Sequence, residues 1–316
     1  MKRLIAALLA FCATQTLAQY PAKPVRLVVG FAPGGSTDTV ARTLAVTLSR
    51  ELAQPVIVEN RPGAGSSIAA EQVSKAPPDG YTVLISPPAG YSVNPAMNPK
   101  LTYSANLQPV TMVGSSPMVV AVNPNTGIQS IRDLVAAANK APGTLNFASS
   151  GNGSAPHLGA ALFQQLAGVK MVHVPFKGGA QAVQSVVAGD TQVTFATPPT
   201  VLGLVQAGRL RALAVTSKAR SPLIPELPGM AEAGLPGYHM SFWYGLFVPA
   251  GTPRDVIDTL FKGATKAVQQ PEVIRVLERE GTEVLVSGSP EAFAGFLAED
   301  TKFWQRLVKE ANVTID

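Results

Sequence analysis

Cysteine is almost absent from this chain, because the only one, Cys12, lies near the N-terminus. Disulfide bonds, catalytic thiolates and cysteine-based zinc sites are therefore excluded from the rest of the chain. Histidine is also scarce, and His157, His173 and His239 do not have the spacing of metal ligands. We therefore expect neither a metal nor a cofactor in this protein.

Aromatic residues make up only 6% of the sequence and charged residues only 14%. So few aromatic rings argue against a stacking platform for single-stranded nucleic acid. The formal net charge is +5, but the basic residues are scattered, so the chain lacks the clustered charge of a nucleic-acid binder. The hydrophobic content of 46% is ordinary for a folded protein of one or two domains.

The N-terminus has the pattern of a secretory signal peptide. Lys2 and Arg3 precede an apolar run at residues 4–11, and Ala18 ends a small-residue cleavage motif. The alternative is an uncleaved anchor, but the run is too short to span a bilayer. Phe11 before Cys12 argues against a lipoprotein signal. We predict a signal peptide at residues 1–18 and a bacterial periplasmic location, since the exported chain would carry no cysteine.

From residue 25 the sequence alternates short apolar runs with amphipathic segments, which predicts parallel strands joined by helices. Residues 26–32 form the first expected strand and residues 37–52 the first expected helix. Two long apolar stretches, 107–122 and 239–248, flank a middle α/β unit. This arrangement predicts an α/β fold with two lobes, each a wound β-sheet flanked by helices, joined by two extended crossing strands. The alternative is one large doubly wound sheet.

The predicted domain boundaries follow from these crossings. The first domain is discontinuous and comprises residues 19–118 and 243–316. The second domain, residues 119–242, is inserted into it.

A strand, a glycine-rich turn and a helix start occur together at residues 25–42, and again at 145–157 and 172–180. The first backbone N–H groups of a helix have no intrahelical partner, and with the helix dipole they favour an anion. The first two turns contain no Lys or Arg, and Lys177 in the third is the one cationic candidate. We expect these turns to face each other and to hold a carboxylate on amides and hydroxyls.

The sequence lacks the motifs of nucleotide binding and of the common catalytic sites. The stretch after Gly63 and the turn at Gly151 both lack the third glycine of a dinucleotide fingerprint, and there is no phosphate-binding loop lysine or Gly-x-Ser-x-Gly elbow. No carboxylate pair suggests acid–base catalysis. Two side chains stay ambiguous at this point: Asp38 either pairs with Arg42 or contacts a ligand, and His157 is either structural or lines the site.

Seven segments, taken together and in order, resemble a known family. They are GFAPGGSTDTVAR at 30–42, VENRPGAG at 58–65, PDGYTVL at 78–84, SSGNGSAPH at 149–157, VPFKGG at 174–179, GRLRALAV at 208–215 and WYGLFVPAGTP at 243–253. The sequence is similar to the Bug-type periplasmic receptors of tripartite tricarboxylate transporters. This resemblance covers nearly the whole chain.

The resemblance implies a two-lobed periplasmic binding protein fold of the type II kind that captures a small carboxylate between its lobes. It implies no catalysis, a monomer, and docking on the permease subunits of a tripartite tricarboxylate transporter. A signalling module that reports to a sensor kinase is the first alternative, and a secreted enzyme is the second. The implied ligand-binding residues are Phe31, Ala32, Gly35, Ser36, Thr37, Asp38, Ser86, Pro88, Ser149, Ser150, Gly151, Asn152, Gly153, Ser154, His157, Phe176, Lys177 and Thr197.

One departure from the family bears on the ligand. Relatives often carry an aspartate that can meet a ligand ammonium, where this sequence has Ala196 and Thr197. The departure disfavours amino acids such as glutamate and favours a di- or tricarboxylate without an amino group, or an aromatic acid.

Overall fold

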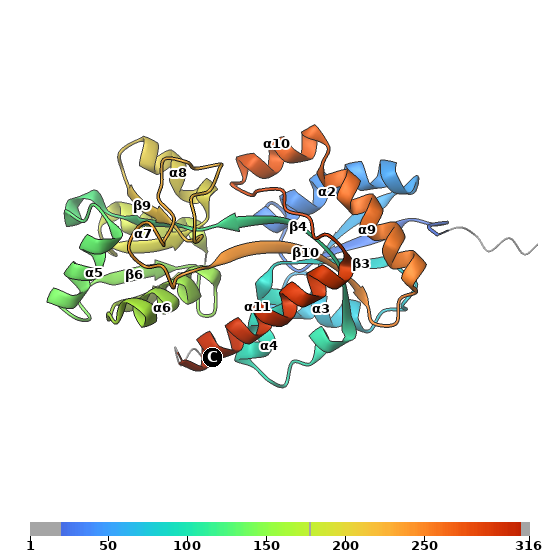
Figure 1. Cartoon of the computed structure of the whole chain (residues 1–316), viewed down its shortest axis with the longest axis horizontal. Helices are drawn as coiled ribbons and strands as arrows, with labels where there is room; N and C mark the ends of the chain where they lie inside the picture. Colours follow the sequence, from blue (N-terminus) through green and yellow to red (C-terminus); the bar gives the residue numbers. More distant parts are fainter. Residues whose placement is uncertain (1–19, 177, 311–316) are drawn as a thin grey trace, which may run out of the picture.

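The computed structural model describes residues 20–176 and 178–310, so the predicted signal peptide and Lys177 lie outside the described residues. The chain forms two lobes, each built on a five-stranded mixed sheet (Figure 1). The strand order is β2-β1-β3-β10-β4 in the first sheet and β7-β6-β8-β5-β9 in the second. This confirms the predicted two-lobed α/β fold over the single large sheet.

The first lobe contains residues from both ends of the described chain. Its strands are β1 (Val25–Val29), β2 (Val56–Asn60), β3 (Thr82–Ser86), β4 (Leu107–Pro117) and β10 (Ser241–Pro249). Its helices are α2 (Ser36–Leu52), α3 (Ser67–Ser74), α4 (Asn94–Met97), α9 (Arg254–Val268), α10 (Pro271–Arg279) and α11 (Pro290–Glu310), with short turns η1 (Ala64–Ser66), η2 (Ala89–Val93) and η3 (Tyr103–Asn106). The predicted strand at 26–32 is too long, because the chain leaves the sheet at Val29 to enter the glycine turn.

Side chains of β1 alternate between the two faces of the first sheet. Leu27 and Val29 pack in the cluster that contains α2 and α9, while Val28 packs in the cluster that contains α3. Successive residues of a strand point to opposite faces, so an unbroken apolar run is what a sheet covered by helices on both sides requires.

The second lobe follows the same plan. Its strands are β5 (Val119–Val122), β6 (Asn146–Ser149), β7 (Val172–Pro175), β8 (Val193–Ala196) and β9 (Arg211–Val215), and its helices are α5 (Ile131–Lys140), α6 (Ala155–Ala167), α7 (Gly179–Ala188) and α8 (Pro198–Gln206), with η4 (Pro124–Thr126). Val120 and Val122 face α5 and α6, while Val119 and Ala121 face α7 and α8.

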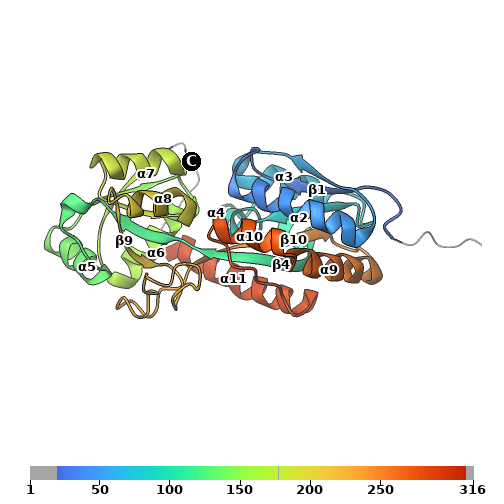
Figure 2. The same cartoon turned by 90° about the horizontal axis from the view of Figure 1, so that it is seen from above.

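Two chain segments run from one lobe to the other (Figures 1 and 2). The first is β4, which continues through Met118 into β5, and the second leads through Met240 into β10. Thr216 joins them: its hydroxyl accepts the Met118 N–H at 2.8 Å and donates to the Met240 carbonyl at 2.8 Å. Thr216 is fully buried, so it fastens the two crossings at the hinge.

Helix α11 packs against both lobes. Phe293 and Leu297, in its first half, belong to the apolar cluster under the first sheet. Trp304 and Leu307, in its second half, share a cluster with Phe163 of α6 in the second lobe. The predicted domain boundaries remain a prediction, and α11 bridges the two units that they define. Within the described residues no helix is both long enough and apolar enough to cross a membrane.

Candidate functional site

The glycine turns of each lobe lie at one edge of its sheet. In the first lobe β1 and β3 are parallel, so the turn after Val29 and the segment after Ser86 leave the sheet on the same side. In the second lobe β6 is parallel to β7 and β8, so the segments after Ser149, Pro175 and Ala196 do likewise. The carboxyl edge of a parallel sheet is where α/β proteins bind ligands.

Asp38 holds the first turn in shape. Its carboxylate accepts hydrogen bonds from the Gly34 amide at 2.9 Å, Arg42 Nε at 2.9 Å and Asn60 Nδ2 at 2.8 Å. Burial alone would raise the pKa of Asp38, but these donors outweigh it and the pKa is lowered. Asn60 also donates to the Phe31 carbonyl at 3.0 Å. The side chain of Asp38 is only 4% exposed, so this geometry favours the structural role over ligand contact.

Ser66 packs beneath the first turn and was missed by the sequence analysis. Its hydroxyl is buried without a hydrogen-bond partner among the described residues. Gly30 and Gly90 close over it, since a Cβ on Gly30 would lie 1.9 Å from Ser66 Oγ and one on Gly90 would lie 2.7 Å away. Ser86 is also fully buried and donates to the Pro87 carbonyl at 3.0 Å. Ser66 therefore supports the first turn at Gly30, and Ser86 packs beside it under Gly90.

The helices after these turns begin without side-chain caps. The residue at the N-cap of α2 is Gly35, and no described side chain caps this helix. Ser154 of α6 and Thr197 of α8 stand at N-cap positions and are of types that often cap, yet neither accepts a bond from its helix. By contrast, Ser130 caps α5 by accepting the Asp133 N–H at 3.1 Å. The first N–H groups of α2 and α6 thus remain available to an anion, apart from Pro156 of α6, which has no N–H. Helix α8 offers none, because it begins with Pro198 and Pro199 and the Thr200 N–H donates to the Thr197 carbonyl at 3.0 Å.

Two hydroxyls of the second-lobe turn, those of Ser149 and Ser154, are engaged within the protein. Ser154 Oγ donates to the Gly151 carbonyl at 2.6 Å. Ser149 is fully buried, and its Oγ lies 2.6 Å from Nε2 of His173 and accepts the Gly151 N–H at 3.1 Å. These protons are committed to the protein, so in this conformation Ser149 and Ser154 shape the turn instead of donating to a ligand.

Two histidines brace the same turn. The rings of His157 and His173 stack with centroids 3.9 Å apart, and His173 stacks on Phe147 at 4.9 Å. Nδ1 of His157 accepts the Gly153 N–H at 3.1 Å, which requires that nitrogen to be unprotonated. Burial, with the neighbouring His173, lowers the pKa of His157 to about 4, and burial lowers the pKa of His173. Both imidazoles are therefore neutral at physiological pH.

The two edges meet at the boundary between the lobes. Pro88 of the first lobe and Gly153 of the second line one small cavity. A Cβ on Gly153 would lie 2.7 Å from the Met97 side chain, and one on Gly281 would lie 2.5 Å from Pro198, so the lobes touch on both sides of the turns.

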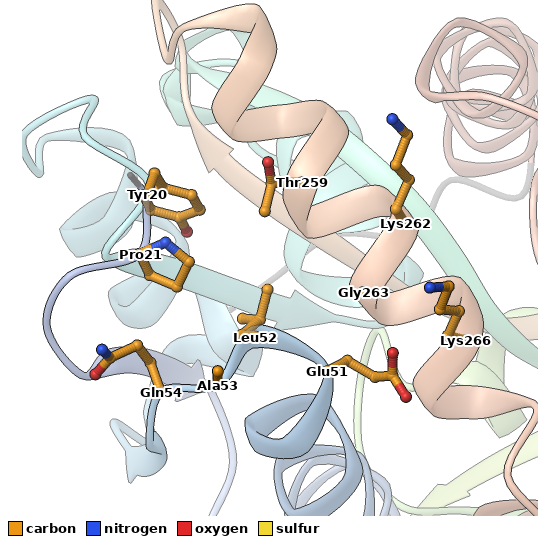
Figure 3. A pocket seen from close by; sticks show the side chains of 10 residues that line it. All are labelled: Tyr20, Pro21, Glu51, Leu52, Ala53, Gln54, Thr259, Lys262, Gly263 and Lys266. Atoms are coloured by element: carbon orange, nitrogen blue, oxygen red, sulfur yellow. The ribbon is translucent and has the colours of Figure 1, made fainter. Parts of the chain in front are cut away.

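The structure places the predicted residues in two groups. Those exposed or half-buried are Phe31, Ala32, Gly35, Ser36, Ser150, Gly151, Asn152, Ser154, His157, Phe176 and Thr197. Those buried are Thr37, Asp38, Ser86, Pro88, Ser149 and Gly153, which form the framework beneath the turns. None of the described predicted residues lines the separate hollow between α2 and α9, whose lining includes Glu51, Lys262 and Lys266 (Figure 3). No group of described side chains could hold a metal ion.

Asn60 and Ser66 are the supporting residues that the sequence analysis left out. Asn60 ends β2, the strand beside β1, and Ser66 follows the Gly-Ala-Gly stretch of the segment at 58–65 that carries part of the family resemblance. The feature that could have identified them is their position: β2 is parallel to β1, so the segment after Asn60 leaves the sheet at the same edge as the first turn.

Comparison with known proteins agrees with this geometry. A family model described as "Tripartite tricarboxylate transporter family receptor" matches residues 40–313. The protein BugT of Bordetella pertussis is 36% identical over 324 residues, covering 100% of this chain and 99% of that protein.

Two solved structures resemble the fold throughout. The R. palustris protein Rpa4515, solved with adipate, has a TM-score of 0.81 and 32% identity and covers 93% of this chain and 99% of its own. MatC (Rpa3494) from Rhodopseudomonas palustris, solved with bound malate, has a TM-score of 0.77 and 29% identity and covers 92% of this chain and 100% of its own.

Proposed function

The chain belongs to the tripartite tricarboxylate transporter receptor family, and we propose that it captures a small dicarboxylate between its two lobes. Members of this family are receptors of a transporter and not enzymes, as the sequence led us to expect. The observation that carries the proposal is the pair of uncapped helix starts at α2 and α6, one on each lobe, at the facing edges of the two sheets.

These helix starts suit a carboxylate at each end of the ligand. The described parts of the turns at 31–37 and 149–156 contain no Lys or Arg, so backbone N–H groups and the Ser36 and Ser150 hydroxyls are the donors left to neutralise charge. A carboxylate that accepts several N–H bonds is stabilised as strongly as one that meets a cation. Lys177, the predicted cationic contact, lies outside the described residues.

The ligand class follows from the relatives and from one substitution. One structural relative was solved with adipate and another with malate, and both compounds are dicarboxylates without an amino group. Ala196 and Thr197 provide no carboxylate for a ligand ammonium. We therefore place non-amino dicarboxylates first, ahead of tricarboxylates and aromatic acids.

The proposed setting is the bacterial periplasm, with residues 1–18 as a cleaved signal peptide. The proposed partners are the permease subunits of a tripartite tricarboxylate transporter, which the family name supports. The alternative is that the ligand-bound receptor reports to a sensor kinase. Deletion of the permease genes separates the two roles, because it should abolish uptake of the ligand and leave a response through a sensor kinase intact.

Thermal unfolding with succinate, malate, adipate, citrate, benzoate and L-glutamate tests the ligand class. A ligand at 100 times its Kd should stabilise the protein by about 2.7 kcal/mol, which is a shift of a few degrees at this size. We expect the largest shifts from the dicarboxylates. A response to L-glutamate alone would contradict the ligand class, and no response to any carboxylate would contradict the proposal.

A matched pair of variants tests the site itself. Gly35→Asp supplies α2 with a good N-cap and a negative charge, so it should keep the unliganded Tm and abolish the dicarboxylate shift. Gln270→Asp adds the same group at the N-cap of α10. That helix begins beside the far end of α2, where Glu272 pairs with Arg50, so the shift should persist. Equal ligand shifts in the two variants would move the ligand away from α2.

A further inference from the structure

A second cavity lies at the hinge, apart from the glycine turns. Its volume is about 400 Å³, which is within the range of small-molecule sites. The side chains that line it come from β4, β10, α11 and the segments before β10 and α11, and most are apolar or aromatic, among them Met112, Met240, Trp243, Phe303 and Trp304. None of the described predicted ligand-binding residues lines this cavity.

A carboxylate stands inside this apolar wall. Asp300 of α11 accepts a hydrogen bond from Ser92 Oγ at 2.6 Å and one from Trp304 Nε1 at 3.1 Å. Burial raises the pKa of Asp300 to about 6, so the group is ionised at neutral pH despite its surroundings. Trp243 is 1% exposed, and its indole N–H also points at this carboxylate and lowers the pKa of Asp300 as a hydrogen-bond donor. Ser92, Trp304 and Trp243 therefore engage most of the acceptor positions of the carboxylate, and none of these donors is a cation.

The nearby charges leave Asp300 without a cation. Glu299, which also lines the cavity, forms an ion pair with Lys302 at 2.8 Å, so the charge of Glu299 is already neutralised at the surface. Arg306 lines the cavity but makes no ion pair with Asp300. Two exposed apolar side chains, Leu285 at 50% and Phe296 at 41%, also line it. The cavity therefore combines an open apolar entrance with an unpaired negative charge.

We propose that this hinge cavity is a second ligand site, which takes a small hydrophobic amine. The ammonium would pair with the part of the Asp300 carboxylate that the indole N–H groups of Trp243 and Trp304 leave open, in a charge-assisted hydrogen bond. The apolar body of the amine would lie against Met112 and Met240. Because α11 packs against both lobes, an occupant here would contact the element that links them.

The chain carries its own reporter for this site. It has two tryptophans, and both Trp243 and Trp304 line the cavity. A titration with 2-phenylethylamine, followed by tryptophan emission, should give a saturable change. The neutral analogue 2-phenylethanol should bind at least tenfold more weakly, and phenylacetate should give no saturable change. Equal responses to the three probes would overturn the proposal.

Variants separate this site from the cleft. Asp300→Asn keeps the shape of the side chain and should remove the preference for the amine over the alcohol. Phe296→Ala, at an exposed position, should weaken both phenyl probes and serves as a second test if Asp300→Asn does not fold. The amine response should persist in Gly35→Asp, whose change lies in the other site. Loss of the response in Gly35→Asp, or an unchanged amine preference in Asp300→Asn, would refute the hinge site while leaving the carboxylate proposal standing.

Discussion

The imidazole rings of His157 and His173 stack almost in parallel, with centroids 3.9 Å apart and an angle of 6° between their planes. Each ring supports a different part of the same glycine turn, because His157 accepts the Gly153 N–H and His173 lies 2.6 Å from the Ser149 hydroxyl. Two charged imidazoles could not occupy this arrangement without repulsion. The turn therefore depends on neutral histidines.

This dependence predicts a loss of stability in mild acid. The pKa of His157 is lowered from 6.5 to about 4, so the unfolded chain binds a proton more readily than the folded one. The contribution of this group is then complete above about pH 6.5 and falls as pH drops towards 4, by about 1–3 kcal/mol because the ring is partly exposed to solvent. Urea unfolding at a series of pH values measures the change.

Two variants isolate the histidine contribution. His157→Asn retains an acceptor for the Gly153 N–H but does not titrate, so its stability should fall less between pH 6.5 and 4. Asp300 acts in the opposite direction: its raised pKa favours the protonated folded form, so its contribution is lost as pH rises towards 6. Asp300→Asn removes that part. Identical pH profiles for wild type and His157→Asn would contradict the prediction.

Gly30 and Gly35 should respond differently to a methyl group. A Cβ on Gly30 would overlap Ser66 Oγ at 1.9 Å and its Cα at 2.7 Å, so Gly30→Ala should cost about 1–3 kcal/mol as the turn shifts. A Cβ on Gly35 would meet only the Ala32 carbonyl at 3.8 Å, at a φ of −82°. Gly35→Ala should therefore cost under about 1 kcal/mol. If calorimetry showed the same loss of stability in both variants, Ser66 would have moved aside to accept the methyl group on residue 30 at little cost.

Asp38→Ala distinguishes the structural role of this carboxylate from ligand contact. The change leaves the Gly34 N–H, Asn60 and Arg42 without their acceptor, so unfolding free energy should drop by about 1.5–3 kcal/mol. Arg42→Ala, which truncates a half-exposed side chain, is the control and should cost much less. If Asp38→Ala kept full stability and lost only ligand affinity, Asp38 would be a ligand contact.

Thr216→Val tests the fastening of the hinge. Valine keeps the shape of the side chain but leaves the Met118 N–H and the Met240 carbonyl without the bridging hydroxyl. We expect a loss of about 1–3 kcal/mol in urea unfolding, because both groups are buried. Thr216→Ser retains the hydroxyl and should recover most of the stability. Equal stability of the valine and serine variants would mean that the bridge contributes nothing.

Much of the fold was predictable because its signals are local. The apolar run of β1, the stripe of Val40, Leu44 and Leu48 along α2, and the glycines between them each follow from the spacing of neighbouring residues. The two crossings were predicted from their length. The break at Met118 and the exact end of β1 were not, because strand ends depend on which backbone groups find partners in the sheet.

The supporting residues of the site could not be predicted in the same way. Asn60 reaches the first turn from 29 positions beyond Phe31, and Thr216 reaches Met118 from 98 positions away. No spacing rule connects residues so far apart. Ser149 and Ser154 were predicted as ligand contacts because hydroxyls suit a carboxylate, and only the folded turn shows their protons donated elsewhere or their oxygens buried.

The sequence by itself determined the strand, glycine turn and helix units and kept Lys and Arg out of the first two turns, so backbone N–H groups became the natural anion donors. Only the tertiary structure decided which groups remain free for a ligand, since a hydroxyl is committed by distance and angle to atoms that folding brings near. It also placed Asp300 between Trp243 and Trp304 at the hinge. These three residues meet because α11 packs across both lobes, and that packing depends on long-range contacts which no local pattern encodes.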